Sequence, residues 1–214
     1  MRPLALAALV VGTAGTGAAA YVIYDRLTQV SPPPPAPAES QPARLAERIP
    51  AISLADRDGT RRSLDDWKGK SLIVNFWATW CAPCRREIPL LASLQQRYGP
   101  EGFQVIGIAA DYRDKVLAYA DETKIQYPLL IGEQDALDAA AAFGVEVIGL
   151  PFTVFSDSEG RIITCHVGEL TDPVARVILG AVERVNRSQA SPAQARSEIA
   201  AGLARLKDET SRRS

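Results

Sequence analysis

The chain has 214 residues and a formal net charge of −1, with 24 Lys and Arg against 25 Asp and Glu. This length suggests one domain with appendages, and the balanced charge gives no reason to expect a nucleic-acid partner. One His excludes a multi-His metal site within a single chain. Three Cys are too few for a scaffold held together by disulfides.

The N-terminal segment, residues 1–27, contains an uncharged stretch from Pro3 to Tyr24 that is long enough to span a bilayer. One interpretation is an uncleaved signal-anchor with Tyr21 and Tyr24 at the membrane interface. The other is a cleavable signal peptide whose small-residue site lies at residues 18–20. We favour the anchor because the apolar run continues past these alanines. Both interpretations place the rest of the chain on the outer, periplasmic face of the cytoplasmic membrane.

Residues 28–43 form a Pro-rich linker whose central part, residues 31–42, reads SPPPPAPAESQP. Such a segment favours an extended polyproline conformation and predicts a semi-rigid stalk. A Pro-rich ligand for a partner is the weaker interpretation, because no basic residue flanks it. At the other end, residues 188–214 are mostly polar. Ile199, Leu203 and Leu206 recur at i, i+4 and i+7, which predicts a short amphipathic helix that fades into a frayed tail.

The globular domain is expected over residues 44–187, where strands and helices alternate. The expected elements are a hairpin turning at Asp58-Gly59, a short capped helix at 63–67, strands at 72–77, 103–109 and 127–131, helices at 81–98, 114–124 and 135–143, a second hairpin of strands 152–155 and 161–167, and a last helix from Thr171. This alternation predicts an α/β fold, with a central sheet covered by helices on both faces.

Cys81 and Cys84 have C-x-x-C spacing at the point where a buried strand gives way to a helix. The free N–H groups and the dipole at a helix N-terminus stabilise a thiolate, the form that attacks a disulfide. We expect Cys81 to be exposed at the helix start, and Cys84 to lie one turn further along the same face, where it can resolve a mixed disulfide. The alternative is that the pair forms half of a zinc site. The only further Cys and His are Cys165 and His166, which are neighbours in sequence and therefore poorly spaced to complete it. The pattern predicts dithiol–disulfide exchange with no metal and no cofactor.

Residues 77–89, WATWCAPCRREIP, resemble the active-site segment of thioredoxin-like proteins of the TlpA/ResA type and are similar to the CcmG/DsbE reductases of cytochrome c maturation. The resemblance covers about residues 49–186 and extends to the anchor-plus-stalk arrangement. It implies a thioredoxin-like fold with a mixed central sheet, an N-terminal hairpin and an inserted central segment at 134–144. It also implies a redox-active disulfide between Cys81 and Cys84.

The same resemblance implies that Pro151 is cis and faces the cysteine pair, so that Leu150 presents its backbone to a substrate strand. The family usually places Thr after this Pro, whereas here Phe152 follows it and Thr153 comes next. Trp80 is expected to line the substrate surface, although an aromatic residue beside a site more often packs than recognises.

Asn75 stands at the strand position where cytosolic thioredoxin carries a buried Asp that helps move protons off the second cysteine. Since Asn cannot titrate, another acid must serve. Glu87 matches a family glutamate beneath the cysteines and lies one helical turn from Cys84. The alternative is a solvated surface charge, or an ion-pair partner beside Arg85 and Arg86. The expected catalytic set is therefore Cys81, Cys84 and Glu87.

Cys165 lies in an apolar strand, and free Cys is often buried, so we expect an inert core thiol. Ile163 and Val167 should share its face by two-residue alternation. His166 then points to the opposite face and is expected to be structural, because the dithiol mechanism needs no His.

The resemblance implies a reductase of disulfides in exported proteins. Its clients would be apocytochrome c or copper-site assembly proteins, and a membrane electron donor of the DsbD/CcdA type would supply it. A disulfide-forming oxidant stays open because sequence does not give the reduction potential. A copper-binding chaperone using Cys81, Cys84 and His166 is a further alternative, although copper carriers on this fold tend to use a wider C-x-x-x-C spacing. The supporting Thr and Arg of a peroxidase are not evident.

Overall fold

The computed structural model describes residues 45–145 and 149–213. The expected anchor and Pro-rich linker lie outside the described residues. Within residues 45–145 and 149–213, no helix is both long and apolar enough to cross a membrane.

One mixed sheet of seven strands organises the domain, in the order β2-β1-β5-β4-β3-β6-β7. Strands β3, β4 and β5 are parallel to one another, and the other neighbours are antiparallel. The strands are β1 (Ser53–Asp56), β2 (Arg61–Ser63), β3 (Ser71–Trp77), β4 (Phe103–Ala110), β5 (Leu129–Gly132), β6 (Phe152–Ser156) and β7 (Ile162–Val167). This topology confirms the expected α/β thioredoxin fold with its N-terminal hairpin.

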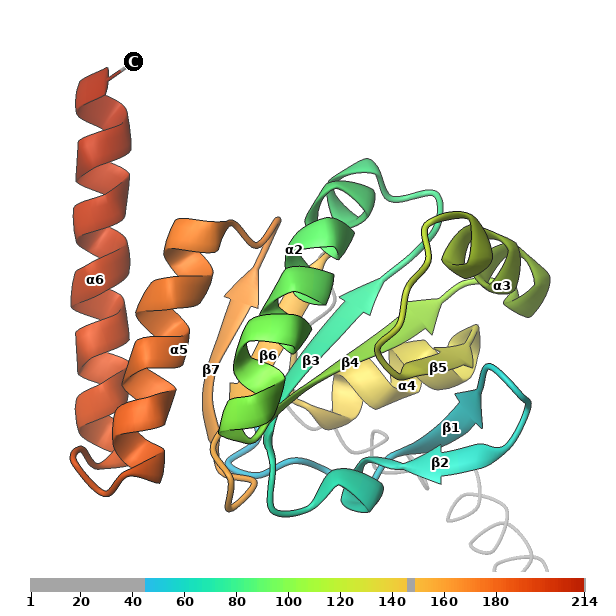
Figure 1. Ribbon diagram of the computed structural model, residues 1–214, viewed down its shortest axis with the longest axis horizontal. Coiled ribbons are helices and arrows are strands. Elements are labelled where there is room, and N and C mark those ends of the chain that lie inside the picture. Colours follow the sequence, from blue (N-terminus) through green and yellow to red (C-terminus); the bar gives the residue numbers. More distant parts are fainter. Residues whose placement is uncertain (1–44, 146–148, 214) are drawn as a thin grey trace, which may run out of the picture. The chain divides into compact units, whose positions relative to one another are not determined.

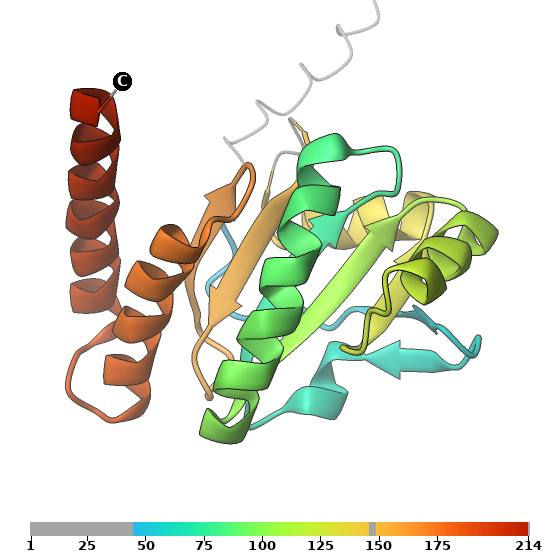
Figure 2. The ribbon, with the colours of Figure 1, turned by 45° about the horizontal axis from the view of Figure 1, so that its top comes forward.

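Helices cover both faces of the sheet (Figures 1 and 2). The helices are η1 (Leu64–Trp67), α2 (Ala82–Tyr98), η2 (Gly99–Glu101), α3 (Arg113–Glu122), α4 (Gln134–Ala142), α5 (Asp172–Asn186) and α6 (Pro192–Arg213). Buried side chains of α2, α3, α5 and α6 form one hydrophobic cluster with one face of the sheet. Those of α4, β1 and η1 form a second cluster on the other face. Helix α4 is the inserted central segment that the resemblance implied.

Strand β3 lies inside the sheet, and all of its residues are buried. Its side chains alternate between the two clusters, so that Ile73 and Trp77 face α2 while Val74 and Phe76 face α4. By the same alternation Asn75 points toward α2, placing a buried polar group directly beneath that helix.

Helix α6 is longer than the sequence suggested, because it continues to Arg213 without a break. Ala195 and Ile199 are buried in the cluster that also contains α5. Arg196 donates hydrogen bonds to the carbonyl oxygens of Ile162 at 2.9 Å and Ile163 at 3.2 Å. These contacts fix the first half of α6 against α5 and β7, and the second half continues as helix where we expected fraying.

The expectation that Ile163, Cys165 and Val167 share one buried face is wrong. The register between β6 and β7 shifts at Phe155 and Ser156, and such a bulge interrupts the two-residue alternation. Ile163 therefore belongs to the α2-side cluster, whereas Cys165 packs against the opposite one. Cys165 is only half-buried, and Val167 is 64 % exposed.

Candidate active site

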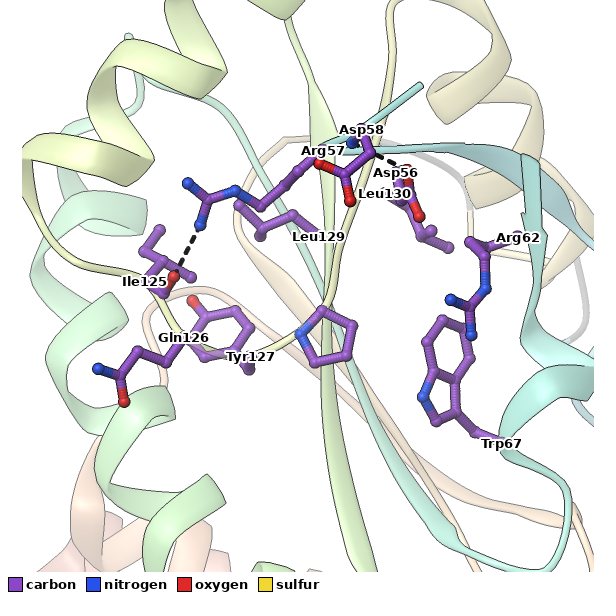
Figure 3. Close-up of a pocket in the computed structure, with 11 residues that line it drawn as sticks. Asp56, Arg57, Asp58, Arg62, Trp67, Ile125, Gln126, Tyr127, Leu129 and Leu130 are labelled. Atoms are coloured by element: carbon purple, nitrogen blue, oxygen red, sulfur yellow. Dashed lines mark hydrogen bonds between the residues drawn. The ribbon is translucent and has the colours of Figure 1, made fainter. Parts of the chain in front are cut away.

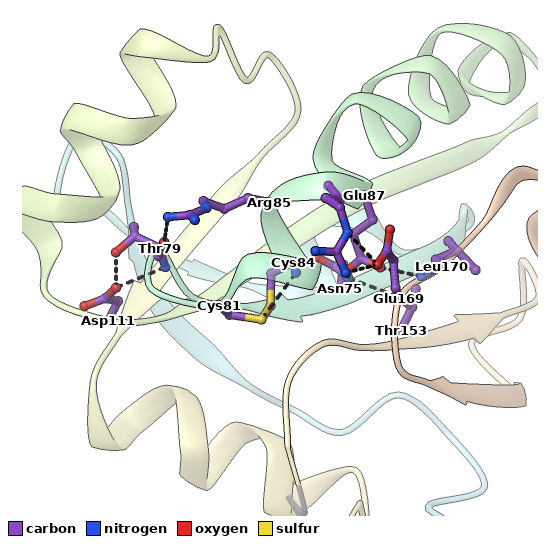
Figure 4. Close-up of a disulfide and its surroundings, with 11 residues drawn as sticks. Asn75, Thr79, Cys81, Cys84, Arg85, Glu87, Asp111, Thr153, Glu169 and Leu170 are labelled. Carbon is purple, nitrogen blue, oxygen red and sulfur yellow. Dashed lines mark hydrogen bonds and ion pairs between the residues drawn. A yellow bond between two sulfur atoms is a disulfide. The ribbon is translucent and has the colours of Figure 1, made fainter.

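A disulfide joins Cys81 and Cys84 at the start of α2, with 1.97 Å between the sulfur atoms (Figure 4). Cys81 is the N-cap residue, and its Sγ accepts a hydrogen bond from the backbone N–H of Cys84 at 3.3 Å. A free N–H group of the first turn thus points at the Cys81 sulfur, where it can stabilise a thiolate. Pro83 fits this first turn because it has no N–H that would need a partner there.

Both cysteines of the disulfide are buried, although the sequence predicted an exposed Cys81. Cys84 is fully buried and Cys81 is 5 % exposed, so the expectation of an exposed Cys81 is wrong for this disulfide form. The Cys81 side chain turns back over the first turn of α2 toward Cys84, and both belong to the α2-side hydrophobic cluster. Leu150 packs against the same cluster.

Glu87 lies on the buried face of α2 and is 1 % exposed, so it is not a surface charge. One carboxylate oxygen, Oε1, accepts a hydrogen bond from Nδ2 of Asn75 at 2.6 Å. The other, Oε2, accepts one from the backbone N–H of Leu170, also at 2.6 Å. Nδ2 of Asn75 donates as well to the hydroxyl of Thr153 at 3.0 Å. Strand β3 and the segment after β7 therefore hold Glu87 directly, and β6 holds the Asn75 amide that contacts it.

Burial raises the pKa of Glu87 to about 7, because the charged carboxylate loses its hydration. The two hydrogen bonds from Leu170 and Asn75 oppose this rise, and the nearby charge of Glu169 adds to it. A carboxyl group with a pKa near neutrality can both take up and release a proton at physiological pH.

The bond between Leu150 and Pro151 is cis, as expected. Pro151 is buried at the start of β6, and its carbonyl oxygen accepts a hydrogen bond from the backbone N–H of Gly168 at 2.9 Å. Trp80 directly precedes Cys81 in the chain and is 67 % exposed. The structure thus places Trp80 at the surface, where the sequence had also allowed a packing role.

Sequence reasoning missed a second polar group near the disulfide, formed by Asp111 and Thr79. The carboxylate of Asp111 accepts hydrogen bonds from both the backbone N–H and the hydroxyl of Thr79. Figure 4 shows the disulfide between this group and the Glu87 group. A signal was available, because Asp111 directly follows an apolar strand that runs parallel to β3, so that both strands end at one edge of the sheet.

A surface pocket of about 540 Å³ lies between the β1–β2 hairpin and the segment before β5 (Figure 3). Arg57 donates to the carbonyl oxygen of Ile125 at 2.9 Å, and the Arg62 guanidinium lies 5.2 Å from the Trp67 ring centroid. The pocket lining includes neither cysteine nor Glu87. Among the described residues, no group of three or more His, Cys, Asp or Glu side chains could hold a metal ion.

A thioredoxin fold with a C-x-x-C disulfide at a helix start and a cis-proline loop defines a thiol–disulfide oxidoreductase. The chain belongs to the Redoxin family, whose model matches residues 44–179.

Similar proteins and solved structures agree with this assignment. The chain is 36 % identical over 129 residues to the thioredoxin-like protein YneN of Bacillus subtilis, covering 58 % of this chain and 72 % of that one. It is 27 % identical over 135 residues to the thiol-disulfide oxidoreductase ResA of Bacillus thuringiensis, covering 63 % and 76 %. A secreted thiol-disulfide isomerase from Corynebacterium glutamicum superimposes with a TM-score of 0.58 at 26 % identity, covering 69 % and 96 %. The expected TlpA/ResA-type resemblance is confirmed, and the chain is a thiol–disulfide oxidoreductase.

Proposed function

We propose that this oxidoreductase works as a reductase of disulfides in exported proteins. The supporting observation is the buried carboxyl group of Glu87, one helical turn from Cys84. A carboxylate near two sulfurs disfavours thiolate and so makes the reduced dithiol less stable. Oxidants of this fold, in contrast, stabilise their reduced form. The Glu87 environment therefore favours electron donation over disulfide formation.

The proposed reaction transfers two electrons from the protein to its client. The Cys81 thiolate attacks one sulfur of the client disulfide, a mixed disulfide forms, and the other client sulfur leaves as a thiolate. Cys84 then attacks Sγ of Cys81, which forms the Cys81–Cys84 disulfide and releases the second client thiolate. The client is reduced and the protein is oxidised.

In this scheme the ionised Glu87 carboxylate accepts the proton of the Cys84 thiol. Cys84 must lose its proton before it can attack, and Glu87 is the titratable group that we assign as its acceptor. A pKa of about 7 allows the carboxyl group to accept a proton in one half of the cycle and return it in the other. Asn75 and Leu170 position the carboxylate through their hydrogen bonds.

The client is proposed to bind across Trp80 on one side of the disulfide and Leu150-Pro151 on the other. The proposed location is the outer face of the cytoplasmic membrane, with residues 1–27 as anchor and residues 28–43 as stalk. A membrane donor of the DsbD/CcdA type would restore the dithiol. The relatives named ResA and the secreted isomerase support this class of role, and apocytochrome c or copper-site assembly proteins are the proposed clients.

The deciding measurement is the reduction potential of the Cys81–Cys84 couple. The full chain in detergent is equilibrated with defined ratios of reduced and oxidised glutathione or dithiothreitol, and the free thiols are trapped and counted. A reductase should give a value nearer about −270 mV, as in thioredoxin, than about −120 mV, as in the oxidant DsbA. A value near the latter would overturn the proposed direction and favour the oxidant.

A further inference from the structure

Two large aromatic side chains are exposed at the edge of the sheet beside the disulfide. Trp80 is 67 % exposed and Tyr112 is 54 % exposed. Trp80 follows the end of β3, and Tyr112 follows the end of β4, the neighbouring parallel strand. Aromatic side chains left in water beside a reactive group are a common feature of contact surfaces, because they offer a large apolar area with few rotatable bonds.

One buried carboxylate connects the chain segments that carry these two rings. Oδ2 of Asp111 accepts hydrogen bonds from the backbone N–H of Thr79 at 3.1 Å and from the Thr79 hydroxyl. Oδ1 accepts one from the backbone N–H of Tyr112 at 2.8 Å. Asp111 is 6 % exposed, so these donors take the place of water around its oxygens.

The Thr79 backbone is held on its other side as well. A guanidinium N–H of Arg85 donates to the Thr79 carbonyl oxygen at 3.2 Å. The peptide groups on both sides of Thr79 therefore have hydrogen-bond partners, and Trp80 leads directly into Cys81. On the Tyr112 side, Nζ of Lys115 lies 4.8 Å from the ring centroid, so one face of the ring has a cation against it.

We propose that Trp80 and Tyr112, here called the aromatic pair, bind apolar side chains of an extended client segment next to its disulfide cysteine, and that Asp111 is the positioning residue for the pair. This inference rests on the proposed function. Continuity with the disulfide supports the choice of occupant: a client sulfur that reaches Cys81 must bring its flanking residues over the segment that begins at Trp80. Tyr112 extends that contact area to the segment between β4 and α3.

The experiment compares two synthetic peptides that carry one cysteine as a mixed disulfide with glutathione. One has Leu and Phe around the cysteine, and the other has Ser and Gly. The reduced full chain is mixed in separate reactions with each peptide and with oxidised glutathione, and the second-order rate constant of each reduction is measured. The wild type should reduce the apolar peptide about three- to tenfold faster than the polar one, the range expected for one or two aromatic contacts.

Tyr112→Ala and Trp80→Ala should each bring this rate ratio toward one. Asp111→Ala should lower the ratio in the same way although it removes no exposed ring. Asp111→Asn keeps one acceptor for Thr79 and should restore part of the ratio. Leu137→Ala, which trims an exposed side chain on α4, and Asp114→Asn, which removes an exposed charge on α3, are matched controls and should keep the wild-type ratio.

The outcomes separate this inference from the proposed function. If no disulfide is reduced, the proposed function fails. A wild type that reduces both peptides and oxidised glutathione but gives a ratio of one overturns the binding role of the aromatic pair, and so does a Tyr112→Ala variant that leaves the ratio unchanged. Either result leaves the proposed reductase function standing. If Tyr112→Ala lowers the ratio and Asp111→Ala does not, Asp111 has no positioning role. Because Tyr112 is exposed, its variant should fold even where the Asp111 variants are less stable.

Discussion

The side-chain amide of Asn75 donates a hydrogen bond to the buried carboxylate of Glu87, with 2.6 Å between Nδ2 and Oε1. The same nitrogen donates to Thr153, which orients the amide with its N–H group toward Glu87. Oδ1 of Asn75 has no hydrogen-bond partner among the described residues. A non-titrating donor at this strand position thus leaves Glu87 as the acid on the buried face of α2, with an amide in place of a carboxylate on β3.

Glu87→Gln should change the pH dependence of thiol reactivity at Cys81. The substitution keeps the shape of the side chain and removes its negative charge, so the Cys81 thiolate should form at lower pH. Alkylation of reduced Cys81 by iodoacetamide, followed by mass spectrometry from pH 5 to 9, should be severalfold faster in the variant near neutrality. Release of a trapped glutathione by Cys84 should slow, because the proposed proton acceptor is gone.

Glu122→Gln is the control for this measurement, because it removes an exposed helical carboxylate on α3. Its alkylation profile should match that of the wild type. Superimposable profiles for the wild type and Glu87→Gln would show that the buried carboxyl group has no influence on the dithiol, and a different group would have to carry the proton.

Glu87 should also make folding stability depend on pH. Its pKa is about 7 in the folded chain against an ordinary value of 4.5, so the folded state binds the proton more tightly than the unfolded state. This contribution is fully present below the unfolded pKa and is lost as pH rises through the folded pKa. From pH 5 to 8, the wild type should lose on the order of 2 kcal/mol more unfolding free energy than Glu87→Gln. Urea unfolding at both pH values measures this, and equal losses would contradict it.

The sequence was sufficient for the alternation of elements, because buried strands such as β3 and helix ends such as Gly99 leave local signals. It also located Glu87, but only the structure shows why that carboxylate is buried. Its partner Leu170 lies 83 positions further along the chain and donates through its backbone, which carries no residue-specific pattern. The bulge in β7 was not predictable either, since an extra residue in a ladder depends on the partner strand.

The order of the two cysteines can be tested by trapping. Cys84→Ser should retain a mixed disulfide through Cys81 when incubated with a glutathionylated peptide, because no second thiol can resolve it. Cys81→Ser should retain almost none, since Cys84 is fully buried behind the first turn of α2. Mass spectrometry of the intact chain measures the adduct, and Cys81→Ser/Cys84→Ser gives the background. Adducts that accumulate with Cys81→Ser instead would reverse the assignment.

Cys165 should react slowly in the folded chain despite its partial exposure. Burial raises the pKa of its thiol to about 11, so little thiolate is present at pH 8. Iodoacetamide should therefore modify Cys165 at least about tenfold more slowly than it does in urea, where the ordinary thiol pKa is restored. Mass spectrometry of the Cys165 peptide measures both rates. Equal rates would mean that β7 does not protect this residue.

Two helical glycines test how α6 docks on α5. A Cβ at Gly202 of α6 would lie 2.6 Å from Cγ1 of Val177, whereas a Cβ at Gly180 of α5 meets nothing within 4 Å. Ala is the better helix former by about 1 kcal/mol, so Gly180→Ala should stabilise the chain by about 0.5–1 kcal/mol. Gly202→Ala should instead destabilise the chain by about 1–3 kcal/mol, because the stiff β-branched side chain of Val177 has to move. Urea unfolding of the two variants measures the difference. If Gly202→Ala is as stable as Gly180→Ala, α6 does not pack against α5 in solution, and the contacts of Arg196 with β7 would not hold the helix in place.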